Sequence, residues 1–264
     1  MGARRGRAGA ERAGVLRACA VAPVLSASDM ISVWERGRDR HLVDRALLIL
    51  AAAYPALSDD ELPALTIGDR DARLLEVRAS TFGPQLDATA VCPRCGIGLE
   101  FSLPAESLRL EPAGASSAPA SWVAGDYTVR LRCLDSRDLA QAVRAGSEDA
   151  ARRCLLERCV VEAVRDGRRV DVESLPAAVT EAIADRMAES DPQADLTARL
   201  HCSECGHGWD VVFDIANVLW VEIAAHTRQL LRDVHALARA YGWREADILA
   251  MSAGRRQLYL EMVG

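Results

Sequence analysis

Cys92-Pro-Arg-Cys95-Gly96 and Cys202-Ser-Glu-Cys205-Gly206 are two copies of one short pattern in this chain of 264 residues. A spacing of two residues lets both thiolates of a turn bind a single metal ion, with sulfur–metal distances of about 2.3 Å. The glycine after the second cysteine suits a turn position with a positive φ angle. The two turns therefore predict one tetrahedral site, whose ligands are Cys92, Cys95, Cys202 and Cys205.

Short stretches with strand character flank both turns. Residues 89–92 lead into the first turn, and residues 99–103 leave it with alternating apolar and polar side chains. Residues 197–201 and 209–213 flank the second turn in the same way. Alternation with a period of two is typical of a half-buried strand. We therefore expect two β-hairpins that share one metal ion, as in a zinc ribbon, split by a long insertion.

Zinc is the expected metal, because a closed site of four thiolates is typical of structural zinc. Iron also binds four thiolates tetrahedrally. Two other interpretations stay open: the cysteines form a disulfide or redox pair, or they are two unrelated pairs of core cysteines. A thioredoxin-like Cys-x-x-Cys begins a helix after a strand. Here Gly96 and a predicted strand follow the first pair, which argues against the redox interpretation.

No group of residues typical of an active site is recognisable. Four thiolates leave no open position for the water that catalytic zinc requires. His201 and His207 adjoin the second turn and could replace a cysteine, but we interpret them as neighbours of the site. The phosphate loop, the Gly-x-Ser-x-Gly elbow, the His-Glu-x-x-His motif and the deaminase His-x-Glu pattern are missing from the sequence. We predict a protein that is not an enzyme and has no small-molecule substrate.

Composition argues against several classes of partner. With 32 Lys and Arg against 38 Asp and Glu residues, the formal net charge is −6. Such an acidic chain offers no general basic surface for nucleic acid or anionic lipid. Its apolar runs are shorter than the ~20 residues of a membrane-spanning helix. The 8 cysteines without an evident export signal favour a reducing compartment, so we expect a cytoplasmic protein.

The first residues have a different character. Arg4, Arg5 and Arg7 precede an apolar run at residues 15–27. Arg17 and Pro23 interrupt that run, whereas a cleavable signal has an unbroken apolar segment. We expect residues 1–27 to be a disordered or loosely ordered lead-in, with Met30 as an alternative start.

The fold class predicted from these patterns is α+β, with helical arms around a small β-hairpin zinc-ribbon-like module. The expected regions after the lead-in are a helical region at 28–87, a split ribbon at 88–103 and 195–214, an insertion at 104–194, and a C-terminal helical arm at 215–264. Within the insertion, residues 104–121 are expected to be a flexible connection. A strand at 127–133 and helices at 148–164 and 174–189 follow.

Several segments outside the cysteine turns resemble a known family. The segments are Trp-Glu-Arg-Gly at 34–37, Arg-Ala-Leu-Leu-Ile-Leu-Ala-Ala-Ala at 45–53, and residues 67–78, 82–84, 127–142, 241–252 and 255–261. They resemble baseplate proteins of contractile-tailed phages and of the related extracellular contractile injection systems. The resemblance spans about residues 28–264.

This resemblance implies a baseplate hub or assembly (chaperone-like) component, which helps other baseplate, hub or spike proteins to join and does no chemistry. Only the four cysteines carry over from it, as metal ligands. An apolar set in the C-terminal arm is the expected docking surface for a partner: Ile248, Leu249, Met251, Leu258, Tyr259 and Met262.

Two functions from other classes compete with this one. A nucleic-acid-binding zinc ribbon would use basic residues near the turns, and the candidates are Arg94, Arg130, Arg132 and Arg199. Nearby Glu100, Glu204 and Asp210 make that set a poor phosphate track. A thiol redox protein is the third possibility.

Overall fold

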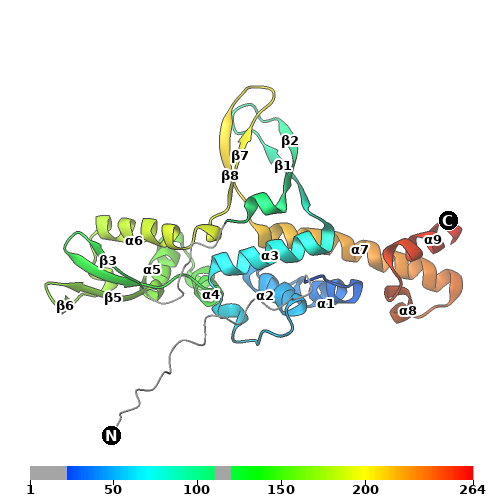
Figure 1. Ribbon diagram of the computed structural model, residues 1–264, viewed down its shortest axis with the longest axis horizontal. Coiled ribbons are helices and arrows are strands. Elements are labelled where there is room, and N and C mark those ends of the chain that lie inside the picture. Colours follow the sequence, from blue (N-terminus) through cyan, green and yellow to red (C-terminus); the bar gives the residue numbers. More distant parts are fainter. Residues whose placement is uncertain (1–22, 111–119, 264) are drawn as a thin grey trace, which may run out of the picture.

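The computed structural model describes residues 23–110 and 120–263. Most of the predicted lead-in, at residues 1–22, lies outside these residues. Figure 1 shows a central helical body, a tower of two β-hairpins above it, an insertion lobe on one side and a C-terminal lobe on the other. Helices and small antiparallel sheets occur together, so the α+β prediction is confirmed.

The central body consists of four helices. They are α1 (Ala27–Gly37), α2 (Leu42–Ala53), α3 (Ile67–Phe82) and α7 (Ile215–Tyr241). Their facing sides form one apolar core, in which Ile49, Leu50, Leu74, Leu219 and Ile223 have no exposed surface. The run of small and aliphatic residues in α2 therefore packs in the body.

Local residues set where these helices begin and end. Ser26 and Asp29 form a capping box at the start of α1, in which each side chain accepts a hydrogen bond from the backbone N–H of the other. Thr66 caps α3. That helix ends at Gly83, whose φ angle of 102° is unfavourable for other residues.

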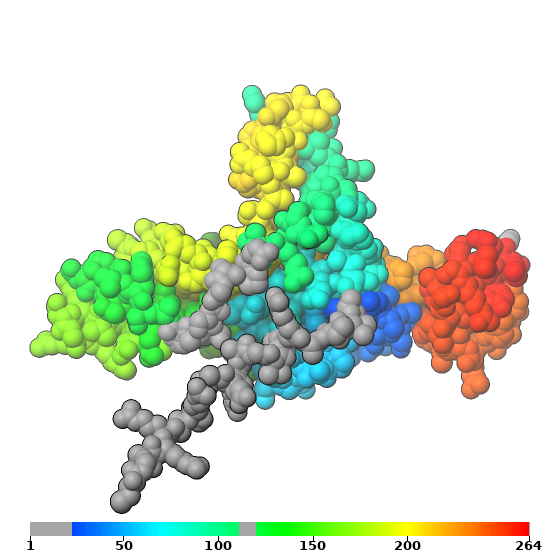
Figure 2. All heavy atoms as spheres, in the orientation of Figure 1, coloured from blue at the N-terminus to red at the C-terminus, as the bar shows by residue number. Residues whose placement is uncertain are grey.

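The tower contains two separate hairpins. One pairs β1 (Gln85–Val91) with β2 (Gly98–Pro104), and the other pairs β7 (Thr197–His201) with β8 (Gly208–Val212). Each hairpin is a two-stranded antiparallel sheet of its own. In Figure 2 the tower stands out from the body as a narrow column. The four strands predicted around the cysteine turns are therefore present.

The base of the tower is fixed to the body. Leu86 is fully buried there. The side chain of Arg78, in α3, donates to the carboxylate of Glu222 in α7 at 2.7 Å and to the carbonyl oxygens of Gly83 and Gln85. Because the Arg78 side chain is only 5 % exposed, these contacts tie α3, α7 and the start of β1 together at a nearly dry position.

The insertion lobe has a second, smaller core. Its sheet has the order β3 (Ala120–Ala124), β4 (Tyr127–Leu131), β5 (Val160–Arg165), β6 (Arg168–Arg169), and its helices are α4 (Ser136–Ala142), α5 (Glu148–Cys159) and α6 (Ala177–Ser190). Val129 from the sheet and Ile183 from α6 are fully buried in this core. The lobe therefore packs around its own apolar residues.

The helix predicted at residues 148–164 is wrong in its second part. After Cys159 the chain forms β5, and Ala163 pairs with Val129 of β4. Three valines between residues 160 and 164 favour a strand, because β-branched side chains lose rotamer freedom in a helix. Asp166 and Gly167, between β5 and β6, have φ angles of 51° and 74°. That combination is typical of a two-residue hairpin turn.

The flexible connection predicted at residues 104–121 is also wrong in part. Its first residues form the 3₁₀ helix η2 (Ala105–Leu108), and Leu108 is buried against the body. Gln193 holds the segment, because it donates to the Leu108 carbonyl at 3.1 Å and accepts from the Leu110 N–H at 2.7 Å. Residues 111–119 lie outside the described part, and β3 begins directly after them.

The C-terminal lobe contains α8 (Glu245–Leu249) and α9 (Ala253–Val263), which fold back on the end of α7. Arg256 in α9 pairs with Asp233 in α7 at 3.3 Å, and both side chains are nearly buried. Ile248 is fully buried. The predicted docking set is therefore wrong for Ile248, which packs within the chain, whereas Leu258 and Met262 remain exposed.

In the part of the chain that the structure describes, we find no helix with the length and apolarity needed to cross a membrane.

The end of α1 packs closely on α7. A Cβ atom at Gly37 would lie 2.7 Å from the nearest ring atom of Trp220, and Arg45 stacks 4.4 Å above that ring. Trp220 is 7 % exposed and therefore has little room to move. The absence of a side chain at Gly37 thus lets the two helices approach.

We predict that Gly37→Ala lowers the free energy of unfolding by about 1–3 kcal/mol, because the added methyl group overlaps the Trp220 ring. Urea unfolding of the purified chain measures this. Gly254→Ala is the matched control, since nothing lies within 4 Å of its added Cβ. There, helix propensity should stabilise α9 by up to about 1 kcal/mol. An equally stable Gly37→Ala variant would contradict the proposed contact.

Candidate metal centre

The two cysteine turns lie together at the far end of the tower. Cys92 directly follows β1 and Cys202 directly follows β7, while Cys95 and Cys205 lie within the turns. The sulfurs of Cys92 and Cys205 are 3.7 Å apart, and those of Cys95 and Cys202 are 3.6 Å apart. All four sulfurs lie within 4.8 Å of one another. The structure therefore brings the two distant pairs into one cluster.

The spacing of the sulfurs fits a tetrahedral metal ion. Four sulfurs at about 2.3 Å from a central ion are roughly 3.8 Å apart along each edge of the tetrahedron. The distances of 3.6 and 3.7 Å agree with this value. They are too long for a disulfide bond, in which the sulfurs are about 2.05 Å apart. The arrangement of donors is thus suited to hold one thiophilic metal ion.

The two turns have the same backbone hydrogen bonds. Cys92 N–H donates to the Ile97 carbonyl at 2.9 Å, and Cys202 N–H donates to the His207 carbonyl at 2.8 Å. In each turn the glycine N–H donates back to the first cysteine carbonyl at 2.9 Å. Gly96 and Gly206 have φ angles of 74° and 67°, as the sequence predicted for these turn positions.

The thiols of Cys92 and Cys95 have different pKa values. Desolvation raises the pKa of Cys92, but hydrogen bonds from the backbone N–H groups of Cys95 and Arg94 and from neighbouring thiols outweigh it and lower the pKa to about 7. A hydrogen bond from the Ile97 N–H lowers the pKa of Cys95, whereas desolvation and the three neighbouring sulfurs raise it. The net result is a pKa of about 12 for Cys95. Thiols this close cannot all ionise unless a cation balances their charge.

The two histidines beside the second turn are not part of the cluster. Among the described residues, the group of mutually close ligand atoms consists of the four cysteines alone. His207 stacks on Trp209 with a ring distance of 6.0 Å. His201 is exposed at the end of β7. Both histidines therefore lie near the site, as the sequence interpretation had them.

The remaining described cysteines belong to the insertion lobe. Cys159 is buried there, and desolvation raises its pKa to about 12. Desolvation also raises the pKa of Cys133. Thiols with raised pKa values are poor nucleophiles and poor metal ligands near neutral pH. Cys19 lies outside the described residues.

The tower has little core of its own above its base. Ala88 and Phe101 of one hairpin and Leu200 and Trp209 of the other alternate with exposed residues, and all four are only half-buried. An isolated two-stranded hairpin is marginally stable in water. Neither hairpin is therefore expected to be stable on its own above the base of the tower.

Sequence reasoning missed the contact that holds the tower at its other end. Arg78 and Glu222 are 144 positions apart, and neither belongs to a recognisable motif. Arg78 follows Leu74, Leu75 and Val77 along α3, and an arginine beside these apolar residues was the one available signal. Its partner can be recognised only from the packing of α3 on α7.

A comparison with protein families identifies the family of the chain that carries this site. The family model described as T4 bacteriophage base plate protein matches residues 35–220. The chain belongs to this family. The matched region of this baseplate protein includes both hairpins, all four cysteines and the whole insertion, and it ends within α7. The resemblance noted in the sequence is confirmed.

Two further comparisons add no relative. Neither the curated proteins nor the solved structures include a significant match to this baseplate protein.

The arginines on which a nucleic-acid interpretation depends do not form a basic track. Arg130 and Arg132 lie in the insertion lobe, away from the cysteine turns. Three of the four arginines are in ion pairs: Arg199–Asp210 at 2.7 Å, Arg130–Glu162 at 3.8 Å and Arg132–Asp138 at 2.7 Å. Charges already paired within the chain contribute little to binding phosphates.

Proposed function

We propose that this baseplate protein is a non-catalytic structural or assembly component of a contractile tail or injection apparatus, and that a structural zinc ion joins its two hairpins. The observation that carries this proposal is the cluster of four sulfurs from two turns on either side of the insertion. Membership in the baseplate family supports the wider role. The partners are other baseplate, hub or spike proteins.

A structural role follows from the donor set. Cys92, Cys95, Cys202 and Cys205 supply four ligands, which is the full coordination of a structural zinc ion and leaves no site for water or substrate. Metal binding of this kind contributes roughly 10 kcal/mol or more to folding in small zinc modules. In this chain that free energy would connect hairpins whose strands are not hydrogen-bonded to each other.

The geometry of the turns disfavours the redox alternative. Both Cys-x-x-Cys pairs lie between antiparallel strands, whereas thioredoxin-type pairs begin a helix, whose N-terminus lowers the thiol pKa. The sulfurs also sit opposite sulfurs of the other turn. That arrangement suits an ion between them.

We predict that protein purified under reducing conditions contains one zinc ion per chain. Cys→Ser at position 92, 95, 202 or 205 should reduce the bound zinc and lower the melting temperature, because a hydroxyl is a poor substitute for a thiolate. Elemental analysis and thermal melting measure these two effects. Cys154→Ser is the matched control and should retain the metal. Bound iron would contradict the choice of zinc, and four reactive thiols without any metal would contradict the site.

A chelator should loosen the tower selectively. After zinc removal, we expect amide hydrogens of β1, β2, β7 and β8 to exchange with solvent faster, since neither hairpin is stable alone. Amides of α2 and α7 should keep their protection, because the body core contains no metal ligand. Hydrogen exchange read by mass spectrometry distinguishes the two regions. Unchanged tower protection in demonstrably metal-free protein would mean that the ion is not structural.

Disruption of the gene tests the assembly role. In the producing strain we expect intact contractile particles to be lost and to return when the wild-type chain is supplied. The Cys202→Ser variant should restore fewer particles, and Cys154→Ser should restore them fully. Electron microscopy counts the particles, and mass spectrometry of purified particles tells a resident component from an assembly factor. Normal particles in the disrupted strain would refute the role, whatever metal the protein binds.

A further inference from the structure

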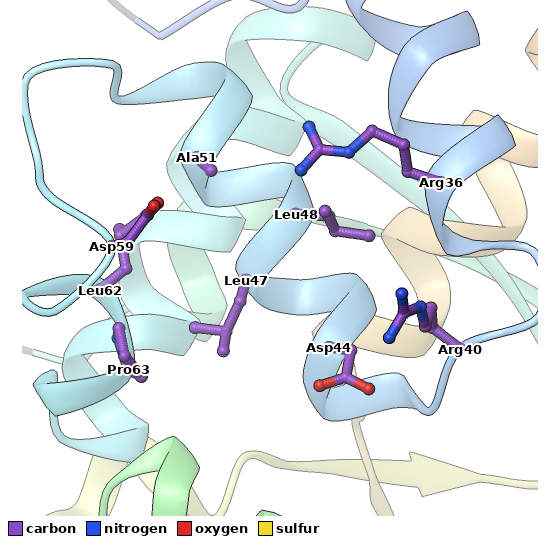
Figure 3. A pocket seen from close by; sticks show the side chains of 9 residues that line it. All are labelled: Arg36, Arg40, Asp44, Leu47, Leu48, Ala51, Asp59, Leu62 and Pro63. Atoms are coloured by element: carbon purple, nitrogen blue, oxygen red, sulfur yellow. The ribbon is translucent and has the colours of Figure 1, made fainter.

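A pocket opens on the body between α1, α2 and the 3₁₀ helix η1 (Leu62–Ala64). Its volume is about 410 Å³. Figure 3 shows that Leu47, Leu62 and Pro63 form one apolar side, while Arg36 and Arg40 reach in from the opposite side. A pocket of this size, apolar with a few charges, is suited to side chains of a binding partner.

The two arginines of this pocket are available for a partner. Neighbouring Arg38 pairs with Asp39, and Arg45 donates to two backbone carbonyls and stacks on a tryptophan. By contrast, neither Arg36 nor Arg40 has an ion pair or a side-chain hydrogen bond within the described residues. Asp44 and Asp59 also line the pocket, so its charge is mixed, with the guanidinium groups gathered on the α1 side.

The outer face of α9 has the complementary character. Leu258 is 58 % exposed and Met262 is 71 % exposed. They are four residues apart and therefore lie on the same side of the helix, next to the exposed Glu261. This face presents two aliphatic side chains between the carboxylate of Glu261 and the exposed guanidinium group of Arg255. A pocket that has an apolar side and charges of both signs at its edge matches such a face.

The α9 helix is held in place while it presents this face. Arg256 pairs with Asp233 of α7, and Tyr259 packs edge-on against Trp243 at a ring distance of 4.8 Å. These contacts keep α9 at the end of α7, which Figure 1 shows well away from α2. The helix cannot reach the pocket of its own chain without losing them, but it can reach the pocket of another copy.

We infer that α9 of one copy docks in the α1–α2 pocket of a second copy. Leu258 and Met262 then pack on Leu47 and Pro63, and Glu261 pairs with the arginines. Because two different surfaces meet, the contact is head-to-tail and leaves one pocket and one helix free at the ends of each assembly. One helix face in one pocket makes a small interface, so we expect weak, salt-sensitive association. The inference does not depend on the metal ion or on baseplate partners.

Sedimentation velocity of the full chain, over a range of concentrations at low salt, tests the inference. The wild type should associate as concentration rises. We expect the pocket variant Arg36→Glu/Arg40→Glu and the helix variant Leu258→Ser/Met262→Ser each to weaken association by at least about tenfold. The matched controls are Arg153→Glu/Arg168→Glu, with the same change in net charge, and Val123→Ser, which also removes an exposed apolar side chain. Both controls should associate like the wild type.

A mixture of the pocket variant and the helix variant tests whether the contact is head-to-tail. Each alone should remain monomeric, but the pocket variant keeps a working helix and the helix variant keeps a working pocket. Their mixture should therefore form a one-to-one dimer that grows no further. All variants change exposed side chains, and unaltered melting temperatures check that they are folded. A wild type that stays monomeric at the highest concentration reached, a mixture that does not dimerise, or controls that dissociate equally would overturn the inference.

Discussion

The meeting of two distant cysteine turns is the constraint on which the rest of the structure depends. The chain leaves the tower after β2, builds the whole insertion lobe, and returns to the tower at β7. The sulfurs of Cys92 and Cys205 are nevertheless only 3.7 Å apart. Both ends of the insertion are therefore tied to the tower. The proposed zinc ion would bind sulfurs of both turns and so connect them, because four thiolates this close together need a cation between them.

The tower is held at its two ends by different chemistry. At the tip, the side chains of Cys92 and Cys202 are buried, with exposed fractions of 1 % and 3 %. At the base, Arg78 bridges the helices of the body through Glu222 and two carbonyl groups. Between them the strands expose much of their surface. This baseplate protein therefore projects a narrow column from a helical body.

Local sequence explains those element boundaries whose signals lie within a few residues. Ser26 with Asp29 marks the start of α1, and Gly83 marks the end of α3, because capping and positive φ angles depend on neighbouring atoms. The prediction failed at residues 160–165. There the helical pattern of α5 continues in the sequence, but the chain forms β5. Pairing with β4 places the valines in a strand, which β-branched residues favour. Such pairing involves residues far along the chain.

The sequence by itself determined the class of fold, the cysteine turns and the family, since these follow from residue type and short spacing. The shared pattern of the two turns also predicted that they meet, which the sulfur cluster confirms. By contrast, the roles of Arg78 at the base of the tower, of outward-facing Leu258 and Met262, and of inward-facing Ile248 are visible only in the folded chain. The physical reason is that each of these facts depends on helices and strands from separate parts of the chain packing together. Burial and partner choice are properties of that packing, and periodicity along the chain does not contain them.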